Sequence, residues 1–196
     1  MSVETNIIKC SSCEWESSEA ILWGRYSYEL PNLTRVSLDR TFGWCFTCED
    51  LVPVEDIGRI HTERDIAERN CREAEQILKQ VEGSLMSTLG FNRKQITKLK
   101  QNRDFARKKL DGVQMLYNVF QSRTSPPRCL TCGESNIVRV NIPEPPPNSV
   151  IPTGFAHPGC GGQLIVEHTR FRIAMKFTQE NVYSLDGKKI KEIPID

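Results

Sequence analysis

The sequence predicts an α+β protein in which two small antiparallel β modules are joined by a long antiparallel α-helical hairpin. Seven of the eight cysteines fall in two clusters near the ends of the 196-residue chain. The middle of the chain instead repeats apolar residues every three or four positions, which is the period of an amphipathic helix. We therefore expect three parts, at residues 1–54, 55–124 and 125–196.

Composition narrows the class of protein. A hydrophobic content of 38% is too high for a disordered chain, and a net charge of +1 excludes a uniformly basic nucleic-acid binder. No apolar stretch approaches the roughly 18 residues of a membrane-spanning helix, and the first ten residues do not have the pattern of a signal peptide. We expect a cytoplasmic protein without membrane contact, where reduced cysteine pairs indicate metal binding rather than disulfides.

The first cysteine cluster consists of Cys10-Ser-Ser-Cys13 and Cys45-Phe-Thr-Cys48. Two residues between thiolates allow a tight turn to point both sulfurs at one position. Two such turns complete a tetrahedron around zinc, with Zn–S bonds of about 2.3 Å. The spacing predicts a first zinc site formed by Cys10, Cys13, Cys45 and Cys48.

The second cluster consists of Cys129-Leu-Thr-Cys132 and His157-Pro-Gly-Cys160, in which His157 replaces a thiolate at the same spacing. It predicts a second zinc site formed by these four residues. Neither set leaves a position open for substrate, so we expect two structural Zn²⁺ ions rather than a catalytic one. The alternatives are buried core thiols or thioredoxin-type redox pairs, but neither cluster has the βαβ context of a redox motif.

Short β-type runs accompany the cysteine pairs: residues 25–30 and 34–40 lie between the pairs of the first cluster, and residues 137–142 and 163–166 flank the loop of the second. Pro31-Asn32 separates the first two runs as a turn. Together with the CxxC turns, these runs resemble the zinc-ribbon superfamily over roughly residues 7–54 and 126–186. The resemblance implies structural zinc beside a small antiparallel sheet in each module. It implies no particular activity, because zinc ribbons occur in transcription, translation and many enzymes.

Two further features are expected to support these modules. Residues 183–190 form a hairpin pattern with an Asp186-Gly187 turn, which we expect to extend the second module's sheet. Trp15, Trp23 and Trp44 are expected to supply a small core around the first cysteine turns.

The first helix of the predicted hairpin follows Pro53. Its inward positions alternate by three and four residues, as in a coiled coil. These positions are Ile57, Ile60, Arg64, Ala67, Cys71, Ala74, Leu78, Val81 and Leu85. Cys71 is therefore predicted to be a small core residue rather than a ligand.

The second helix is predicted to start at Asn92, an N-cap residue, with Gln95 at the capping-box position and Phe91 packed on Ile96. It ends before Ser125-Pro126-Pro127. Its inward positions are Ile96, Leu99, Arg103, Ala106, Leu110, Val113, Tyr117 and Phe120. Residues 55–82 carry 5 basic and 8 acidic groups, and residues 83–123 carry 9 and 2, so the two helices can neutralise each other.

Residues 85–100 also resemble the helix-turn-helix of DNA-binding regulators, with Gly90 at the turn and Ile96 and Leu99 buried. Met86 departs from the small residue usual in that motif. The alternative interpretation places basic and polar side chains of segment 85–109 on DNA or RNA. These side chains are Arg93, Lys94, Gln95, Lys98, Lys100, Arg107 and Lys108. Ion pairs from these residues to glutamates of the first helix would argue against that interpretation.

No Gly-rich phosphate loop, Ser/His/Asp set or carboxylate pair is recognisable in the sequence. We therefore expect a non-enzymatic protein-interaction or adaptor module with a protein partner. A DNA- or RNA-binding regulator is the alternative. An enzyme is the least favoured possibility, and a deep polar pocket beside His168 or Cys71 would support it.

Overall fold

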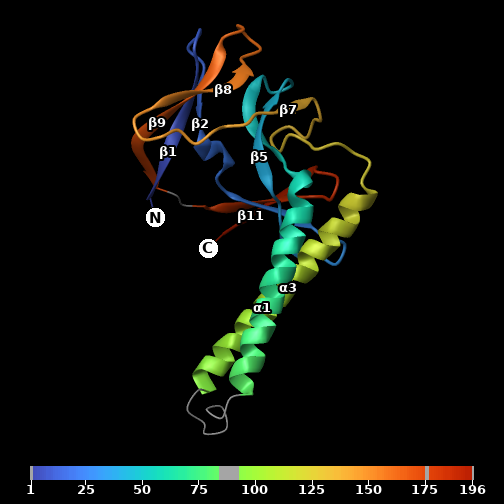
Figure 1. Ribbon diagram of the computed structural model, residues 1–196. Helices are drawn as coiled ribbons and strands as arrows, with labels where there is room; N and C mark the ends of the chain where they lie inside the picture. The colour runs from blue at the N-terminus through green and yellow to red at the C-terminus, as the bar shows by residue number, and fades with distance from the viewer. Residues whose placement is uncertain (1, 84–92, 175–176, 196) are drawn as a thin grey trace. The chain divides into compact units, whose positions relative to one another are not determined.

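The computed structural model describes residues 2–83, 93–174 and 177–195 (Figure 1). Within these ranges, eleven strands form three sheets. The strands are β1 (Ser2–Cys10), β2 (Glu16–Ser18), β3 (Arg25–Glu29), β4 (Arg35–Ser37), β5 (Arg40–Cys45), β6 (Asp50–Glu55), β7 (Ile137–Arg139), β8 (Val150–Ala156), β9 (Gln163–Ala174), β10 (Gln179–Tyr183) and β11 (Lys189–Pro194). The same ranges contain two α-helices, α1 (Ile60–Glu82) and α3 (Arg93–Ser122), and two short 3₁₀ helices, η1 (Glu19–Leu22) and η2 (Ile57–Arg59).

Each sheet combines strands from before and after the helices. The strand orders are β2-β1-β9-β8, β11-β10-β3-β4 and β6-β5-β7. Figure 1 shows β1, at the start of the chain, beside β9, and these strands pair antiparallel with Cys10 opposite Leu164. Residues up to Asp56 and from Ser125 onward accordingly form one compact unit, and Ile57–Thr124 form a second.

The predicted fold class is therefore wrong: the protein is mostly β, and it is not two separate ribbons joined by a helical hairpin. The physical reason is that strand pairing is not local. A strand with partners on both sides buries its apolar residues best, and β1, between β2 and β9, buries Ile8 completely. Local sequence patterns identify a strand but not its neighbours.

Two predicted hairpins are present but lie in a sheet that was not predicted. β3 and β4 pair antiparallel with Tyr28 opposite Val36, and β10 pairs antiparallel with β11. Gly187 has φ +82 in the turn between β10 and β11, a conformation that favours glycine. β10 then pairs in parallel with β3, so the two hairpins form one sheet instead of extending the metal-binding modules.

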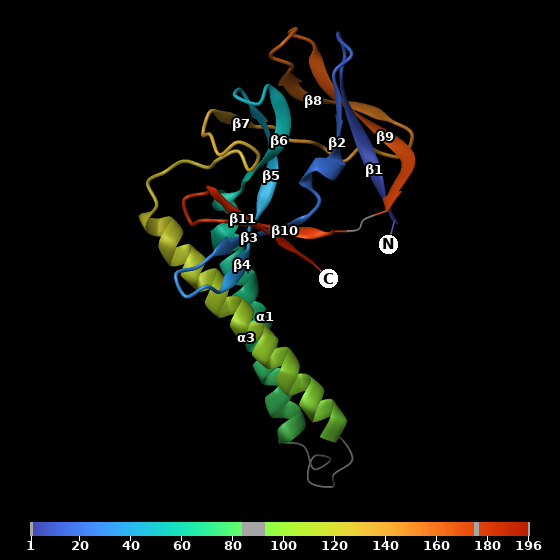
Figure 2. The same cartoon turned by 180° about the vertical axis from the view of Figure 1, so that it is seen from behind.

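The two helices lie side by side in both views and run antiparallel (Figures 1 and 2). Glu82 pairs with Lys100 at 3.1 Å near one end of α1, and the ring of His61 contacts that of Tyr117 near the other. The predicted inward positions Ile60, Ala67, Cys71 and Leu78 are buried, so Cys71 is a core residue of α1. The predicted Leu85, Met86, Gly90, Phe91 and Asn92 lie outside the described residues. Neither described helix is sufficiently long and apolar to span a membrane.

A buried carboxylate connects two of the sheets. Glu55, at the end of β6, is completely buried. It accepts hydrogen bonds from the Tyr28 hydroxyl of β3 at 2.6 Å and from the Arg128 amide at 2.8 Å. A Cβ added to Gly187 would lie 2.5 Å from the same carboxylate, so the β10–β11 turn also packs closely against Glu55.

We predict that Glu55→Ala destabilises the β unit by about 2–4 kcal/mol, because it leaves the buried Tyr28 hydroxyl and Arg128 amide without this acceptor. Denaturant unfolding with metal present measures the change. Glu144→Ala, which removes an exposed carboxylate, is the matched control and should change stability by less than about 0.5 kcal/mol. Equal stability of the two variants would contradict the role assigned to Glu55.

Candidate metal centres

The structure gathers the eight predicted ligands into two groups of four, and the ligand atoms of each group lie within 4.8 Å of one another. We call the group of Cys10, Cys13, His157 and Cys160 the outer centre, and the group of Cys45, Cys48, Cys129 and Cys132 the inner centre. Each centre can hold a metal ion. The predicted assignment of pairs to sites is wrong, because the first pair along the chain joins the fourth and the second joins the third.

Strand pairing explains this nested order. β1 ends at Cys10, and its neighbour β9 begins three residues after Cys160, so their pairing brings the first and last ligand turns together. In the inner centre, β5 ends at Cys45, which lies opposite Ile137 of β7. Because β7 follows the Cys129–Cys132 turn, the same ladder positions the second and third pairs. The sequence prediction joined the pairs that are consecutive along the chain.

In the outer centre, the ligand atoms are spaced as the corners of a coordination tetrahedron. The Sγ atoms of Cys10 and Cys160 are 3.3 Å apart, and His157 Nδ1 lies 3.3 Å from Cys13 Sγ and 3.2 Å from Cys160 Sγ. A tetrahedron with Zn–S bonds of about 2.3 Å has sulfur–sulfur edges of about 3.8 Å. A disulfide would require about 2.05 Å. The spacing is therefore close to that of metal ligands, and Nδ1 is the imidazole nitrogen that faces the thiols.

The inner centre has the same kind of geometry with four sulfurs. Cys45 Sγ lies 3.6 Å from Cys132 Sγ, and Cys48 Sγ lies 3.9 Å from Cys129 Sγ. The backbone amides of Thr131 and Cys132 each donate to Cys129 Sγ at 3.4 Å. Amides that point at sulfur stabilise thiolates, which are the form that binds metal.

Hydrogen bonds and burial shift the pKa values of the ligand thiols in opposite directions. Burial raises the pKa of Cys10, but the Ser12 amide and the neighbouring thiols of Cys160 and Cys13 stabilise its thiolate and lower that pKa to about 6. Burial raises the pKa of Cys129 to about 11, despite its amide donors. Thiolates this close repel one another, so a divalent cation is the kind of group that allows all of them to ionise.

An aromatic cluster connects the two centres. Trp44, which adjoins Cys45 of the inner centre, is 2% exposed, and its ring lies edge-on to His157 of the outer centre at 5.1 Å. Trp15 packs against both rings, at 5.4 Å from His157 and 5.5 Å from Trp44. Two of the three predicted core tryptophans thus lie against a ligand, whereas Trp23 is half-buried at the end of η1.

Close approach of the outer ligand turns depends on a glycine. A Cβ added to Gly162 would lie 2.6 Å from Ser12 Oγ and 2.7 Å from Cys10 Sγ. Any larger residue would therefore separate the Cys10 turn from the Cys160 turn. Two glycines follow Cys160 in the sequence, and only the structure shows that Gly162 has this contact.

The predicted nucleic-acid contacts on α3 do not share one face. Lys100 is exposed and forms the ion pair with Glu82, and Lys94, Gln95, Lys98, Arg107 and Lys108 are also exposed. Within the part of the chain that the structure describes, no ion pair joins Lys94, Lys98, Arg107 or Lys108 to α1. Arg93 is the first residue of α3, and its side chain lies outside the described residues.

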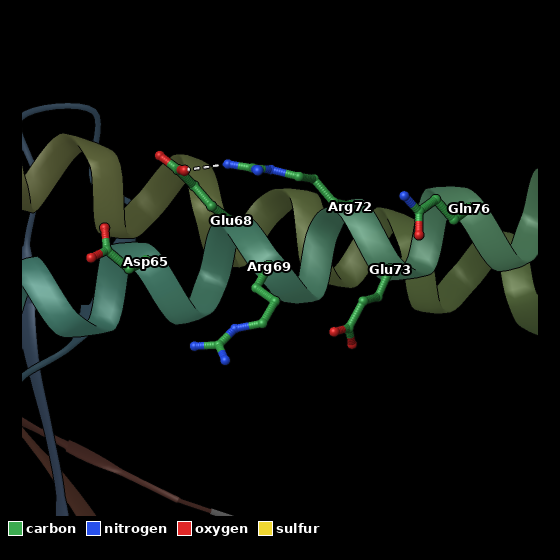
Figure 3. Close-up of a pocket in the computed structure, with 6 residues that line it drawn as sticks. All are labelled: Asp65, Glu68, Arg69, Arg72, Glu73 and Gln76. Atoms are coloured by element: carbon green, nitrogen blue, oxygen red, sulfur yellow. Dashed lines mark hydrogen bonds and ion pairs between the residues drawn. The ribbon is translucent and has the colours of Figure 1, made fainter.

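Concave surfaces away from the metal centres are lined mostly by charged and polar side chains. One is a charged strip of α1 (Figure 3), where Glu68 pairs with Arg72 at 2.9 Å while Arg69 and Glu73 point to another side. Another lies beside His168 and is lined also by Asn6, Glu19, Ile142, Glu144, Pro145 and Pro147. Among the described residues, His168 and these carboxylates do not form a group within metal-binding distance.

Comparisons of the chain with protein-family models, with curated proteins and with solved structures give no significant match. The two clusters therefore suggest zinc-binding modules on geometry alone, and zinc-ribbon membership stays a prediction.

We predict that paired cysteine substitutions distinguish the nested order from the consecutive one. Cys13→Ser with Cys160→Ser removes ligands from the outer centre only, so the protein should retain about one of its two metal ions. Cys13→Ser with Cys48→Ser damages both centres and should leave almost none. Metal analysis of the purified variants measures this, and the opposite result would favour the consecutive pairing.

We also predict that Trp44→Leu weakens the outer centre selectively. Trp44 belongs to the hydrophobic cluster that contains Cys10, whereas Cys45 and Cys129 pack in a separate cluster. Loss of a group that orients a ligand lowers metal affinity by about 10–100-fold, so a competing chelator should remove one ion much earlier than the other. Trp23→Leu is the control. Simultaneous loss of both ions from Trp44→Leu would show that the effect is not selective.

Proposed function

We propose that the protein is a non-enzymatic zinc protein in which two structural centres hold a β scaffold that binds a protein partner. The observation that carries the proposal is that each centre has a full set of four ligands supplied by the chain. Four sulfurs, or three sulfurs and one imidazole, form the ligand sets of structural zinc sites. Soft thiolates with tetrahedral spacing favour zinc over magnesium or calcium, which prefer oxygen ligands.

The closed ligand sets support a structural rather than a catalytic role. Catalytic zinc needs a coordination position for water or substrate, and four protein ligands occupy all positions of a tetrahedral ion. In the outer centre, His157 is 7% exposed and packed between two tryptophan rings, which further restricts access. When bound, zinc would cross-link strands that are distant in sequence.

A protein partner is the first candidate for what the scaffold binds. The inner centre adjoins β7, the edge strand of its sheet, and Val138 of β7 is 39% exposed. Phe46, inside the Cys45–Cys48 turn, is 44% exposed. An edge strand with exposed apolar side chains is a common docking element for another chain.

Nucleic acid is the second candidate, and a separate observation favours it. Residues 83–123 carry 9 basic and 2 acidic groups, and several of the lysines on α3 are exposed and without an ion pair among the described residues. Such a surface suits phosphate binding. The helix-turn-helix hypothesis depends on residues 84–92, which lie outside the described residues.

X-ray absorption at the zinc edge tests the structural role of the metal. We expect averaged coordination by about seven sulfurs and one nitrogen over two ions, with no oxygen ligand. Removing zinc with a chelator should also lower the unfolding temperature of the β unit, because binding energy contributes to folding. A zinc-bound oxygen would contradict the closed centres and support an enzyme.

A further inference from the structure

We propose that the face of α3 around Phe105 binds single-stranded nucleic acid by stacking a base on the Phe105 ring while neighbouring lysines contact phosphates. This inference rests on the second candidate function and specifies its surface and ligand. We define the Phe105 face as Phe105 with Lys94, Lys98, Gln101, Asn102, Lys108 and Lys109.

Helix geometry places these residues together. With 3.6 residues per turn, every member lies within about 60° of Phe105 around the helix axis. The lysines extend over 15 residues from Lys94 to Lys109, which corresponds to about 22 Å. The half-buried residues Ile96 and Leu99 lie on a different side of α3, so the Phe105 face is turned away from the helix pairing.

The exposure of the Phe105 ring is unusual on a helix that carries so many charged residues. Its side chain is 72% exposed, and it contacts no other ring within the described ranges. Removing an aromatic ring from water is favourable. A ligand that covers the exposed Phe105 ring would therefore gain binding energy. Aromatic rings on basic surfaces bind unpaired bases by stacking, which requires one flat face and no particular sequence.

The charges on this face are available for phosphates. Lys94, Lys98, Lys108 and Lys109 are exposed, and none forms an ion pair with any described residue. On the same helix, Lys100 and Arg103 are engaged with Glu82 and Asp104 and lie outside the Phe105 face. Four of the exposed basic residues of α3 therefore lie on the side that also exposes the ring, whereas Arg107 lies on another side.

The surroundings of Phe105 favour nucleic acid over a protein. The centre of a protein interface is apolar and depleted in lysine. The neighbours of Phe105 one turn before and after it are Gln101, Asn102, Lys108 and Lys109, all polar and exposed. These amides and ammonium groups suit bases and phosphates, whereas a protein interface would require more apolar residues around the ring.

Binding of the full-length, zinc-loaded protein to fluorescein-labelled oligo(dT) of about 15 nucleotides tests the proposal, with a duplex of equal length and an oligoglutamate peptide as further probes. We expect oligo(dT) to bind most tightly. The affinity should fall with salt at a slope of about −0.7 per phosphate contact, or about −3 for four lysines.

Substitutions separate stacking from charge. Phe105→Ala and Phe105→Leu should each weaken oligo(dT) binding by about 10-fold or more at every salt concentration and leave the salt slope unchanged. Lys98→Gln should reduce the slope by about 0.7. Met115→Ala, on the same helix and 41% exposed, and Lys79→Gln, on α1, are the matched controls and should bind as the wild type does. Because all of these side chains are exposed, circular dichroism and zinc content should not change.

Other results would overturn the proposal in distinguishable ways. Absence of binding to any nucleic acid at low salt would exclude both the inference and the nucleic-acid candidate, and would leave the zinc centres unaffected. Oligo(dT) binding that is unchanged in Phe105→Ala and Lys98→Gln would exclude the Phe105 face and leave the nucleic-acid candidate with another surface. Tight oligoglutamate binding that tolerates Phe105→Leu would identify an acidic protein as the ligand.

Discussion

The nested order of the four Cys/His pairs is the constraint on which the β unit depends. The first pair meets the fourth and the second meets the third, so each centre joins a segment before the helices to one after them. The strands that lead into the ligand turns must then pair across the same distance, as β1 does with β9 and β5 with β7. Because closing such long loops costs entropy, strong metal–ligand bonds suit these positions.

The two centres pack against two separate apolar clusters, and Trp44 brings the outer centre's cluster next to the inner centre because it adjoins Cys45. Trp44 lies in β5 beside Cys45 of the inner centre, and its ring packs on His157 of the outer centre. The ring of Trp15 packs against both of these rings. Small zinc modules have little apolar interior, so the two tryptophans give the outer centre more buried area than its ligand turns could supply. Glu55 also connects distant parts of the β unit, in this case through hydrogen bonds. Its carboxylate accepts from Tyr28 of β3 and from the backbone amide of Arg128, which follows α3.

Local features of this protein were predictable because they depend on neighbouring residues. Tight CxxC turns, the Asp186-Gly187 turn and the periodicity of α1 each involve a few consecutive positions. Pairing of β10 with β3 and of Cys10 with Cys160 depends on residues more than a hundred positions apart, and neither element carries a local sign of its partner. The exposed ring of Phe105 was also missed, because periodicity identifies the buried side of a helix and not the use of the other side.

The sequence by itself singled out, from thiolate and imidazole chemistry at this spacing, the eight residues that the structure gathers into two groups within metal-binding distance. It also predicted the two helices and the burial of Cys71, because the 3.6-residue period of apolar residues can be recognised within a single segment of sequence. Only the tertiary structure decided which Cys/His pairs lie within metal-binding distance of each other, which hairpins share a sheet and which lysines of α3 have no ion pair with a described residue. These are relations between distant segments, and their energies arise only when the chain has folded.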